Sequence, residues 1–401
     1  MAVGGSIDMI SEFQVNTHTD GAQQYPAVTG LLEGDWVVVW LSLFQDGLTF
    51  SVRGLRYSGA TGAKAGVEFM LNENTNVFRD EPDLAPLPDG GFVTVWSDGP
   101  TSNDANIVYR QYGNTGSPLG GPQVINTFTD NYQRYPAVAS KSDGNFVVVW
   151  SSYLQDGDAL GVFGQRMRMS LGAIGPEFPV NTTTTDIQWN SEVAYLPDGG
   201  FVVVWESKNQ DEPGGYGVYA RVWDLNGIAV TDEIPVNTFT GSDQRYPSLA
   251  VSTDGRFLVV WESWNQSGFG SDLYGQWFNT DFEPTGDELH LNSFLLDNQR
   301  RPVITSLDGG DLVLLYAGSG KHAHTGTHLR RLDAAGQPLA FDSRVNRNQF
   351  DNGTVWYQDI APLADGGFVT VWQAGGDQDG ESFGVFAARY NANGIRIYAG
   401  P

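Results

Sequence analysis

The sequence contains no cysteine, which excludes disulfide bridges and thiolate metal sites, so stability must come from packing or from closure of the fold. Lysine and arginine are scarce, at 22 of 401 residues against 47 aspartates and glutamates. The net charge of −25 repels nucleic acid and anionic lipid. Solubility in a salty medium is the simpler explanation of this charge, and binding of divalent cations is the more specific one. No apolar run reaches the length of a membrane span, so no membrane insertion is expected.

An apolar run that ends in an aromatic residue recurs seven times along the chain. The final aromatic residues are Trp40, Trp96, Trp150, Trp205, Trp261, Tyr316 and Trp372, at intervals of 54 to 56 residues. A second series with the same period consists of Asn16, Asn72, Asn126, Asn181, Asn237, Asn292 and Asn346. Abundant glycine and aromatic residues favour an all-β fold. The two phased series therefore predict seven copies of one β-sheet unit.

The fold predicted from this repeat is a seven-bladed β-propeller of four-stranded antiparallel blades, forming a single domain over residues 1–401. The approximate units are 12–66, 67–120, 121–175, 176–230, 231–286, 287–340 and 341–401. In the third unit we expect strand A at 136–139, strand B at 146–150 and strand C at 162–167, with 122–126 as the outer strand of the preceding blade. Strand B is apolar on both faces, as a blade packed between two others requires. An open array of β-modules and a β-solenoid are the alternatives, and both need capping units.

The two ends of the chain predict how the ring closes. The last unit ends after 394–398, where the fourth unit continues from the matching 227–231 into an outer strand. A segment with the pattern of that missing strand occurs at the other end of the chain, at 12–16. We therefore expect the N-terminal strand to complete the last blade, which leaves no open sheet edge.

The connections within each unit are of two kinds. The links from strand A to B and from C to D are tight turns with glycine, such as Asp89-Gly90-Gly91. The links from B to C and from D to A are longer, acidic and variable. Alternate connections of an antiparallel meander lie at the same end, so both variable sets are predicted to share one face. Because loops on a rigid scaffold carry function, that face is the candidate binding face.

The motifs V-N-T, Q-x-Y-P-A-V, D-G-G-F-V-V-V-W, Q-D-G and G-V-x-x-Q-R together resemble repeats in very large bacterial cell-surface or secreted proteins, which often carry hemolysin-type calcium-binding segments. The resemblance covers all seven units. It implies a module, extracellular or at the cell surface, that is part of a longer polypeptide. The glycine-aspartate nonapeptides that bind calcium in such proteins are missing from this sequence. A secretory signal pattern is also missing from the first residues, which fits a cytosolic chain, an excised piece or another export route.

The loops from strand D to strand A are predicted to surround the mouth of a central channel. They contain the candidate ligand-binding residues Gln133, Arg134, Tyr135, Trp189, Gln244, Arg245, Tyr246, Arg300 and Arg301. Rings that stack and polar groups that fix orientation suit a glycan or another surface ligand. The alternative is that the glutamine and arginine side chains bond the backbone of neighbouring blades.

Candidate metal ligands occur in the loops from strand B to strand C. Asp156, Asp158, Asp377 and Asp379 are spaced as calcium ligands in turns can be, although turn-forming aspartates look the same without a metal. The sixth unit carries His322, His324 and His328, which together suit a transition metal. With Arg300 and Arg301, the same sector also suits an anionic sugar. The simplest explanation of this irregular unit is neutral divergence of the sequence of one blade.

Three functions remain open at the level of sequence. The leading interpretation is a non-catalytic extracellular module for binding or adhesion, which recognises a glycan or another surface ligand, with calcium as a structural ion. The second is a hydrolase or lyase that acts on polysaccharides at the channel mouth, and the third is an architectural spacer. No familiar catalytic motif is present, but paired carboxylates of a glycosidase cannot be recognised from spacing alone.

Overall fold

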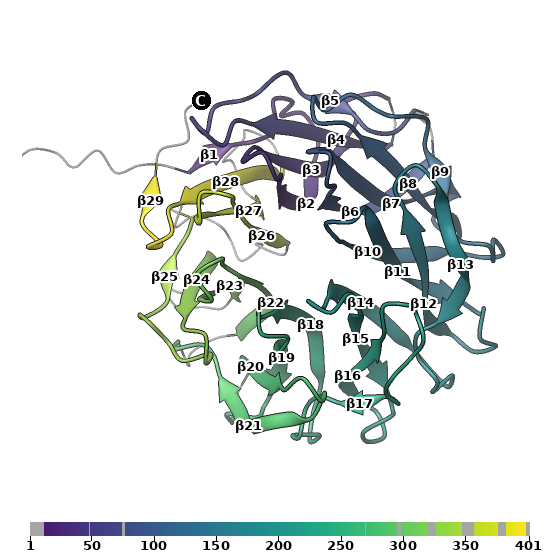
Figure 1. Ribbon diagram of the computed structural model, residues 1–401, viewed down its shortest axis with the longest axis vertical. Coiled ribbons are helices and arrows are strands. Elements are labelled where there is room, and N and C mark those ends of the chain that lie inside the picture. The colour runs from purple at the N-terminus through teal and green to yellow at the C-terminus, as the bar shows by residue number, and fades with distance from the viewer. Residues whose placement is uncertain are drawn as a thin grey trace, which may run out of the picture.

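The computed structural model describes residues 12–47, 49–73, 77–268, 270–294, 298–319, 326–346, 357–375 and 382–397. Within these ranges the chain forms seven antiparallel sheets and contains no helix. The sheets are arranged radially about a central axis, in chain order around the ring (Figure 1). The prediction of a seven-bladed propeller is confirmed. In the described part of the chain there is accordingly no helix of the length and hydropathy needed to cross a bilayer.

The first four blades are each built as a meander from the axis outward. Blade 1 contains β2 (Gln23–Gly30), β3 (Trp36–Leu43), β4 (Phe50–Tyr57) and β5 (Phe69–Met70). Blade 2 contains β6 (Phe78–Pro86), β7 (Phe92–Thr101), β8 (Asp104–Tyr112) and β9 (Gln123–Val124). Blade 3 contains β10 (Gln133–Ser140), β11 (Asn145–Tyr153), β12 (Leu160–Arg168) and β13 (Gly172–Pro179). Blade 4 contains β14 (Gln188–Tyr195), β15 (Phe201–Lys208), β16 (Tyr216–Trp223) and β17 (Ile234–Pro235).

The remaining three blades follow the same plan, except that the last is shared between the two ends of the chain. Blade 5 contains β18 (Gln244–Val251), β19 (Phe257–Trp264), β20 (Ser271–Phe278) and β21 (Pro284–His290). Blade 6 contains β22 (Asn298–Ser306), β23 (Leu312–Ser319), β24 (Gly326–Leu332) and β25 (Ser343–Arg344). Blade 7 contains β26 (Gln358–Pro362), β27 (Phe368–Ala374), β28 (Gly384–Tyr390), β29 (Arg396–Ile397) and the N-terminal β1 (Phe13–Gln14).

The second strand of each blade is buried on both faces, as the sequence predicts. The aromatic residue near its end is fully buried in all seven blades, at Trp40, Trp96, Trp150, Trp205, Trp261, Tyr316 and Trp372. Apolar clusters form between consecutive blades rather than within one, so that Val95 of blade 2 packs in the same cluster as Val148 of blade 3. Burial of this surface between blades is what holds the ring together.

The periodic asparagines all make the same hydrogen bond. In blade 3 the Oδ1 atom of Asn181 accepts from the backbone N–H of Val162 at 2.6 Å. The corresponding donors in the seven blades are Val52, Ile107, Val162, Val218, Leu273, Thr327 and Val385. The asparagine side-chain oxygen thus replaces a backbone carbonyl as the hydrogen-bond acceptor at the point where the outer strand ends. For this reason the outer strand expected at 122–126 is shorter in the structure, where only Gln123–Val124 is paired as strand β9.

The ring is closed by the N-terminal strand, as predicted. Phe13 and Gln14 of β1 pair with Ala387 and Phe386 of β28. The Phe13 ring lies 5.6 Å from the ring of Tyr57 in blade 1, and Val15 is fully buried. The N-terminal strand β1 therefore completes blade 7 and contacts blade 1, which joins the last blade to the first (Figure 1).

Candidate active site

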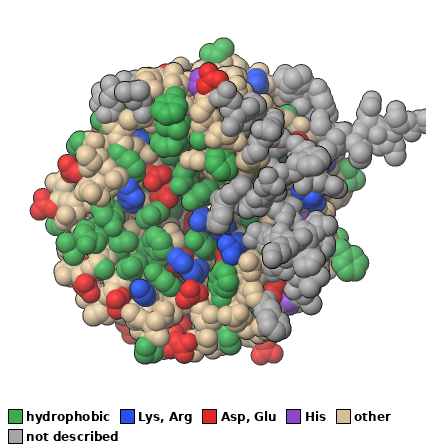
Figure 2. Space-filling model, turned by 180° about the vertical axis from the view of Figure 1, so that it is seen from behind, with side chains coloured by type: hydrophobic (Ala, Val, Ile, Leu, Met, Phe, Trp, Pro, Cys, Tyr) green, Lys and Arg blue, Asp and Glu red, His purple; other side chains and the backbone are tan. Residues whose placement is uncertain are grey.

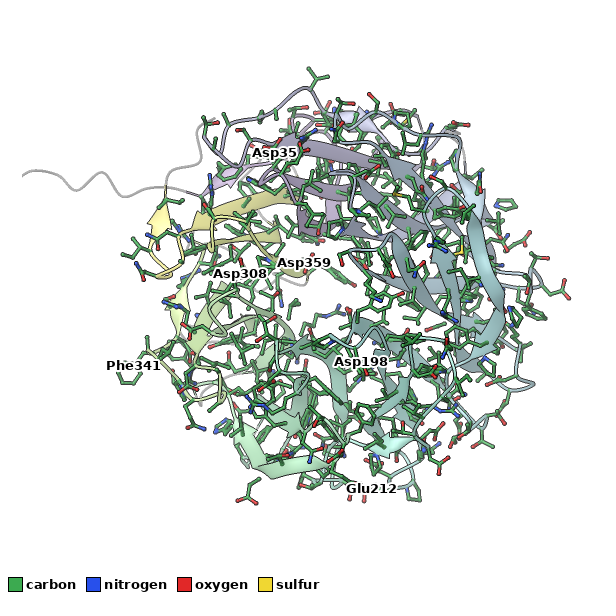
Figure 3. The ribbon with its side chains drawn as sticks, in the orientation of Figure 1. Asp35, Asp198, Glu212, Asp308, Phe341 and Asp359 are labelled. Carbon is green, nitrogen blue, oxygen red and sulfur yellow. The ribbon has the colours of Figure 1, made fainter. Side chains whose placement is uncertain are left out.

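A cavity of about 350 Å³ lies on the axis, where the innermost strands of all seven blades begin. Its walls come from β2, β6, β10, β14, β18, β22 and β26. Asp359, on β26, lies beside the central opening when the ring is viewed along its axis, and Glu212 lies at the outer rim (Figure 3). The cavity is therefore the one place in the described structure to which every blade contributes a side chain.

The entrance of this cavity is formed by one residue from each blade, which we call the mouth ring. Its members are Tyr25, Glu81, Tyr135, Asn190, Tyr246, Arg301 and Tyr357. The first six have a positive φ between 47° and 56°, and each lies at a β-bulge in its strand. A residue other than glycine in this conformation costs about 1–3 kcal/mol, and such strain is concentrated at functional sites. The bulge turns each side chain of the mouth ring toward the axis.

Three of the strained backbone positions are supported by the preceding blade. The backbone N–H of Tyr246 donates to Oε1 of Glu206 at 2.8 Å, and that of Arg301 donates to Oε2 of Glu262 at 3.2 Å. Across the closing seam, the N–H of Tyr25 donates to Oε1 of Gln373 at 3.2 Å. Acceptors at the end of one blade's second strand thus fix the entrance residue of the next blade.

A second ring lies two residues further along the same strands. It consists of Ala27, Asp83, Ala137, Glu192, Ser248, Val303 and Asp359. Three of its seven positions carry a carboxylate, and the others carry a small or apolar side chain. Carboxylates from blades 2, 4 and 7 therefore face a common cavity.

Two of these carboxylates also bond the adjacent blade. Asp83 accepts from the backbone N–H of Val138 at 2.7 Å, and Asp359 accepts from that of Val28 at 2.7 Å. Ser248 does the same for Ile304 at 3.2 Å. Asp83 and Asp359 consequently combine a structural contact with a position on the cavity wall.

Glu192 differs from the two aspartates. Its side chain is exposed to the cavity, and it forms no hydrogen bond with any residue that the structure describes. A carboxyl group without a partner on the wall of a cavity is free to exchange a proton with a ligand.

The proton affinities of the three carboxyl groups are raised. Burial, followed by the charge of Asp359, raises the pKa of Asp83 to about 7. Burial also raises the pKa of Asp359 to about 6, against the opposing effect of two backbone N–H donors. Reduced hydration inside the ring, followed by the charges of Asp83 and Asp359, raises the pKa of Glu192 well above its usual value. No cation of the described chain is among the groups that set these three pKa values.

Aromatic rings and one guanidinium cover part of the entrance. The Arg301 guanidinium lies 4.3 Å from the ring centre of Tyr246 and 4.4 Å from that of Tyr357. The Tyr357 ring lies in turn 4.1 Å from the ring of Tyr25. Basic and hydrophobic side chains also lie together around the centre of the face seen from behind (Figure 2). This arrangement offers flat apolar surface and hydrogen-bond donors at the same entrance.

The predicted glutamines serve the loops themselves. The side chains of Gln133 and Gln244 are fully buried. Gln133 donates to the carbonyl of Asp130 at 3.1 Å, and Gln244 accepts from the indole N–H of Trp261 at 3.1 Å. Both glutamines are therefore held by contacts in their own loop and blade, and not by the backbone of a neighbouring blade.

Three of the predicted arginines lie at blade junctions, one residue before the mouth ring. Each guanidinium lies over an aromatic ring: Arg134 over Phe78 at 4.5 Å, Arg245 over Tyr216 at 4.4 Å and Arg300 over Trp264 at 5.1 Å. Of the predicted ligand-binding residues, Tyr135, Tyr246 and Arg301 line the cavity.

Of the predicted metal ligands, Asp156, Asp158 and His328 lie among the described residues, and the N–H of Asp158 donates to Oδ1 of Asp156 at 3.5 Å. Asp156 accepts from the side-chain amide of Asn181 at 3.4 Å, and Asp158 accepts from the N–H of Asp186 at 2.9 Å. His328 is buried beside the rings of Tyr316 and Phe294. The positions Asp377, Asp379, His322 and His324 lie outside the described residues. Within the described ranges no group of three or more potential ligands is assembled, and calcium binding stays a prediction.

Sequence reasoning did not identify Asp83, Glu192 and Asp359. Their signal is present in the repeat, because the matching positions of other blades carry small residues such as Ala27 and Ala137. Glu192 stands out among these positions, because Asp83 and Asp359 bond the adjacent blade and Glu192 bonds no residue that the structure describes.

Neither a family model nor a curated protein matches the sequence. Among solved structures, a protein of unknown function from Dyadobacter fermentans is 13% identical with a TM-score of 0.58, covering 79% of this chain and 96% of that one. An alpha-L-arabinanase from Penicillium chrysogenum, complexed with arabinobiose, is 13% identical with a TM-score of 0.55, covering 96% and 99%. An alpha-L-arabinofuranosidase from Fusarium graminearum, complexed with an iminosugar inhibitor, is 13% identical with a TM-score of 0.54, covering 77% and 92%. At these identities the similarity establishes the fold.

The leading interpretation of the sequence, a non-catalytic module for binding or adhesion, is wrong. Solved propellers of this shape include the arabinanase and the arabinofuranosidase, whose function is to cleave glycosidic bonds. The sequence-based argument relied on the absence of catalytic motifs. A motif cannot reveal Asp83, Glu192 and Asp359, which lie 109, 167 and 276 positions apart in the sequence, although the ring places them on one cavity.

Proposed function

We propose that this protein is a glycoside hydrolase that cleaves a polysaccharide or oligosaccharide in the axial cavity. The observation that carries the proposal is the convergence of Asp83, Glu192 and Asp359 on that cavity, with their pKa values raised. Glycosidases require one protonated and one ionised carboxyl group on either side of the scissile bond. Environments that separate the pKa values of neighbouring carboxyl groups provide this pair.

In this proposal Glu192 is the general acid. Its raised pKa favours the protonated form, and since no residue that the structure describes hydrogen-bonds to it, the proton is available to the glycosidic oxygen. As the bond to the anomeric carbon breaks, the proton of Glu192 passes to the departing sugar.

Asp359 is the ionised partner, because its pKa, raised to about 6, lies below that of Asp83, which is raised to about 7. It either removes a proton from the attacking water or attacks the anomeric carbon itself. The anomer of the first product distinguishes these two routes. Burial and the charges of Asp83 and Asp359 together favour the protonated form of Glu192.

The mouth ring provides sugar binding. The rings of Tyr25, Tyr246 and Tyr357 offer apolar faces for stacking on pyranose or furanose rings, and Arg301 donates hydrogen bonds to hydroxyl oxygens. Arabinan and arabinobiose are the first substrates to try, since the arabinanase complexed with arabinobiose shares the fold. Action outside the cell remains a prediction from the repeat resemblance.

The test is release of reducing sugar from arabinan, arabinobiose, xylan and pectin by the wild-type protein and the Glu192→Gln variant. We expect cleavage of at least one substrate, with the rate lowered by a factor of about 100 or more in the variant. Ser248→Ala is the matched control, because Ser248 occupies the same ring without a carboxylate. Retention of full activity by Glu192→Gln would refute the assignment. An unsaturated product would identify a lyase instead, and failure to cleave any of the four substrates would count against the hydrolase.

A further inference from the structure

A cluster of aromatic and basic side chains adjoins the cavity entrance at the junction of blades 4 and 5. It consists of Trp189, Lys208, Tyr216 and Arg245, and we call it the blade-4 platform. The Arg245 guanidinium lies 4.4 Å from the ring centre of Tyr216 and 5.5 Å from that of Trp189. The Lys208 ammonium lies 5.8 Å from the ring centre of Tyr216. All four side chains are partly exposed.

A buried carboxylate fixes the orientation of this platform. Glu206 is fully buried and accepts from the indole N–H of Trp189 at 2.9 Å and from the Arg245 guanidinium at 3.1 Å. The same carboxylate accepts from the amide of Asn190 at 2.7 Å. Charge-assisted hydrogen bonds of this kind hold side chains in one geometry before a ligand arrives.

The platform is continuous with the mouth ring. The edge of the Trp189 ring meets the ring of Tyr135 at 5.4 Å between centres. Glu206 also accepts from the backbone N–H of Tyr246. One buried residue therefore fixes two platform side chains and two mouth-ring residues together. The continuity agrees with the basic and hydrophobic side chains that adjoin one another around the centre of the rear face (Figure 2).

We propose that the blade-4 platform binds the part of a sugar chain that extends beyond the axial cavity. The proposal rests on the proposed glycoside hydrolase function and specifies its substrate as an oligosaccharide or polysaccharide chain. A cavity of about 350 Å³ is small for a polymer and accommodates a short segment of it. The exposed ring surface of Tyr216 and Trp189 stacks on successive sugar rings, and Lys208 and Arg245 donate hydrogen bonds to their oxygens.

The test measures kcat/KM on oligosaccharides of increasing length, using arabino-, xylo- and galacturono-oligosaccharides of about two to six residues. We expect kcat/KM to rise with length for the wild-type protein. Tyr216→Ala removes this rise through a higher KM, which amounts to about a tenfold loss on the longest chain for one lost stacking contact. Tyr216→Phe retains the ring and restores the dependence on length.

Tyr153→Ala is the matched control, because Tyr153 of blade 3 stacks on Tyr132, in the loop before β10, at 4.9 Å and is not part of the platform. Its kcat/KM should equal that of the wild type at every chain length. The proposal would be refuted if Tyr153→Ala lost as much kcat/KM on long chains as Tyr216→Ala. It would also be refuted if kcat/KM of Tyr216→Ala still rose with chain length as in the wild type.

A second measurement separates failure of the platform from failure of the hydrolase. Isothermal titration calorimetry on the Glu192→Gln variant, with and without Tyr216→Ala, reports binding of the same oligosaccharides without cleavage. If long chains bind through Tyr216 and the wild-type protein cleaves none of them, the platform stands and the hydrolase fails. If chains are cleaved and Tyr216→Ala binds the long ones as tightly as its parent, the platform fails and the hydrolase stands.

Discussion

The side-chain oxygen of Asn16 accepts a hydrogen bond from the backbone N–H of Val385 at 2.8 Å, across 369 positions of the chain. The same bond is made within a continuous stretch in other blades, as between Asn237 and Val218. The same side-chain hydrogen bond is thus present in every blade, but in blade 7 its two partners come from opposite ends of the chain. The closing blade relies on noncovalent contacts to hold its outer strand.

We expect Asn16→Ala to release the N-terminal strand. Loss of the acceptor leaves the buried N–H of Val385 unsatisfied, at a cost of about 1–3 kcal/mol in the free energy of unfolding. Asn237→Ala has a similar local cost but cannot free a chain end. Limited proteolysis followed by mass spectrometry measures the difference. Early cleavage near residue 16 in Asn16→Ala alone is the expected result, and identical digestion of the two variants would contradict it.

Blade 2 replaces the buried glutamine with an ion pair, which predicts a compensated double variant. Arg79 is fully buried and contacts Asp98 at 3.0 Å, and Asp98 accepts from the indole N–H of Trp96 at 3.1 Å. In blade 1 the Trp40 indole instead donates to Gln23 at 3.2 Å.

Removing one partner of this pair should destabilise the protein by about 3 kcal/mol, as in Arg79→Ala, because the carboxylate of Asp98 loses its cation. The double variant Arg79→Gln/Asp98→Ser imitates blade 1, where Ser42 and Gln23 are neighbours in the ladder, and should recover most of the loss. Urea denaturation of Arg79→Gln, Asp98→Ser and the double variant measures the free energy of unfolding that tests this. If the double variant lost as much stability as the two single variants combined, the Arg79–Asp98 pair would not act as a unit.

Stability should decrease between about pH 4 and pH 7 because of the cavity aspartates. The pKa of Asp83 is raised to about 7 in the folded protein, and an aspartate in an unfolded chain titrates near about 3.9. The folded state therefore holds this proton more tightly than the unfolded state. The contribution of Asp83 to the free energy of unfolding is thus complete below about pH 4 and is lost as the pH rises through 7. Asp83→Asn keeps an oxygen acceptor and does not titrate. Its melting temperature relative to wild type should rise across this interval, whereas a constant difference would refute the shift.

The pH dependence of catalysis should follow two carboxyl groups. We expect kcat/KM to fall below about pH 6, where Asp359 becomes protonated, and to fall on the alkaline side as Glu192 loses its proton. The residual activity of Glu192→Gln should lack the alkaline limb and keep the acid limb. Rates on the best substrate across this pH range provide the measurement. An alkaline limb that persists in Glu192→Gln would assign the acid to another residue.

The repeat made the fold predictable. Seven phased aromatic residues and seven phased asparagines specify the blades, since each forms one burial or hydrogen-bond contact that every blade needs. Closure at 12–16 was predictable as well, because the last unit lacked a strand whose pattern occurred elsewhere.

The site was predictable only in part. Tyr135, Tyr246 and Arg301 were identified because the loops that precede them are conspicuous. Asp83, Glu192 and Asp359 were not, because single acidic residues in apolar strands resemble isolated exposed positions. Their proximity is produced by the curvature of the ring. The sequence indicates these positions only when the seven units are compared with one another, as the small residues Ala27 and Ala137 at matching positions show.

The mouth ring has a consequence for how such proteins acquire new specificities. Tyrosine, glutamate, asparagine and arginine occupy the same left-handed backbone position in different blades, with φ values that agree within 9°. A replacement at one of these positions therefore changes the chemistry presented to a ligand without moving the scaffold. Six side chains held in the same backbone conformation around one opening make the entrance suitable for combinatorial redesign, in which each of these blades is varied by a single codon.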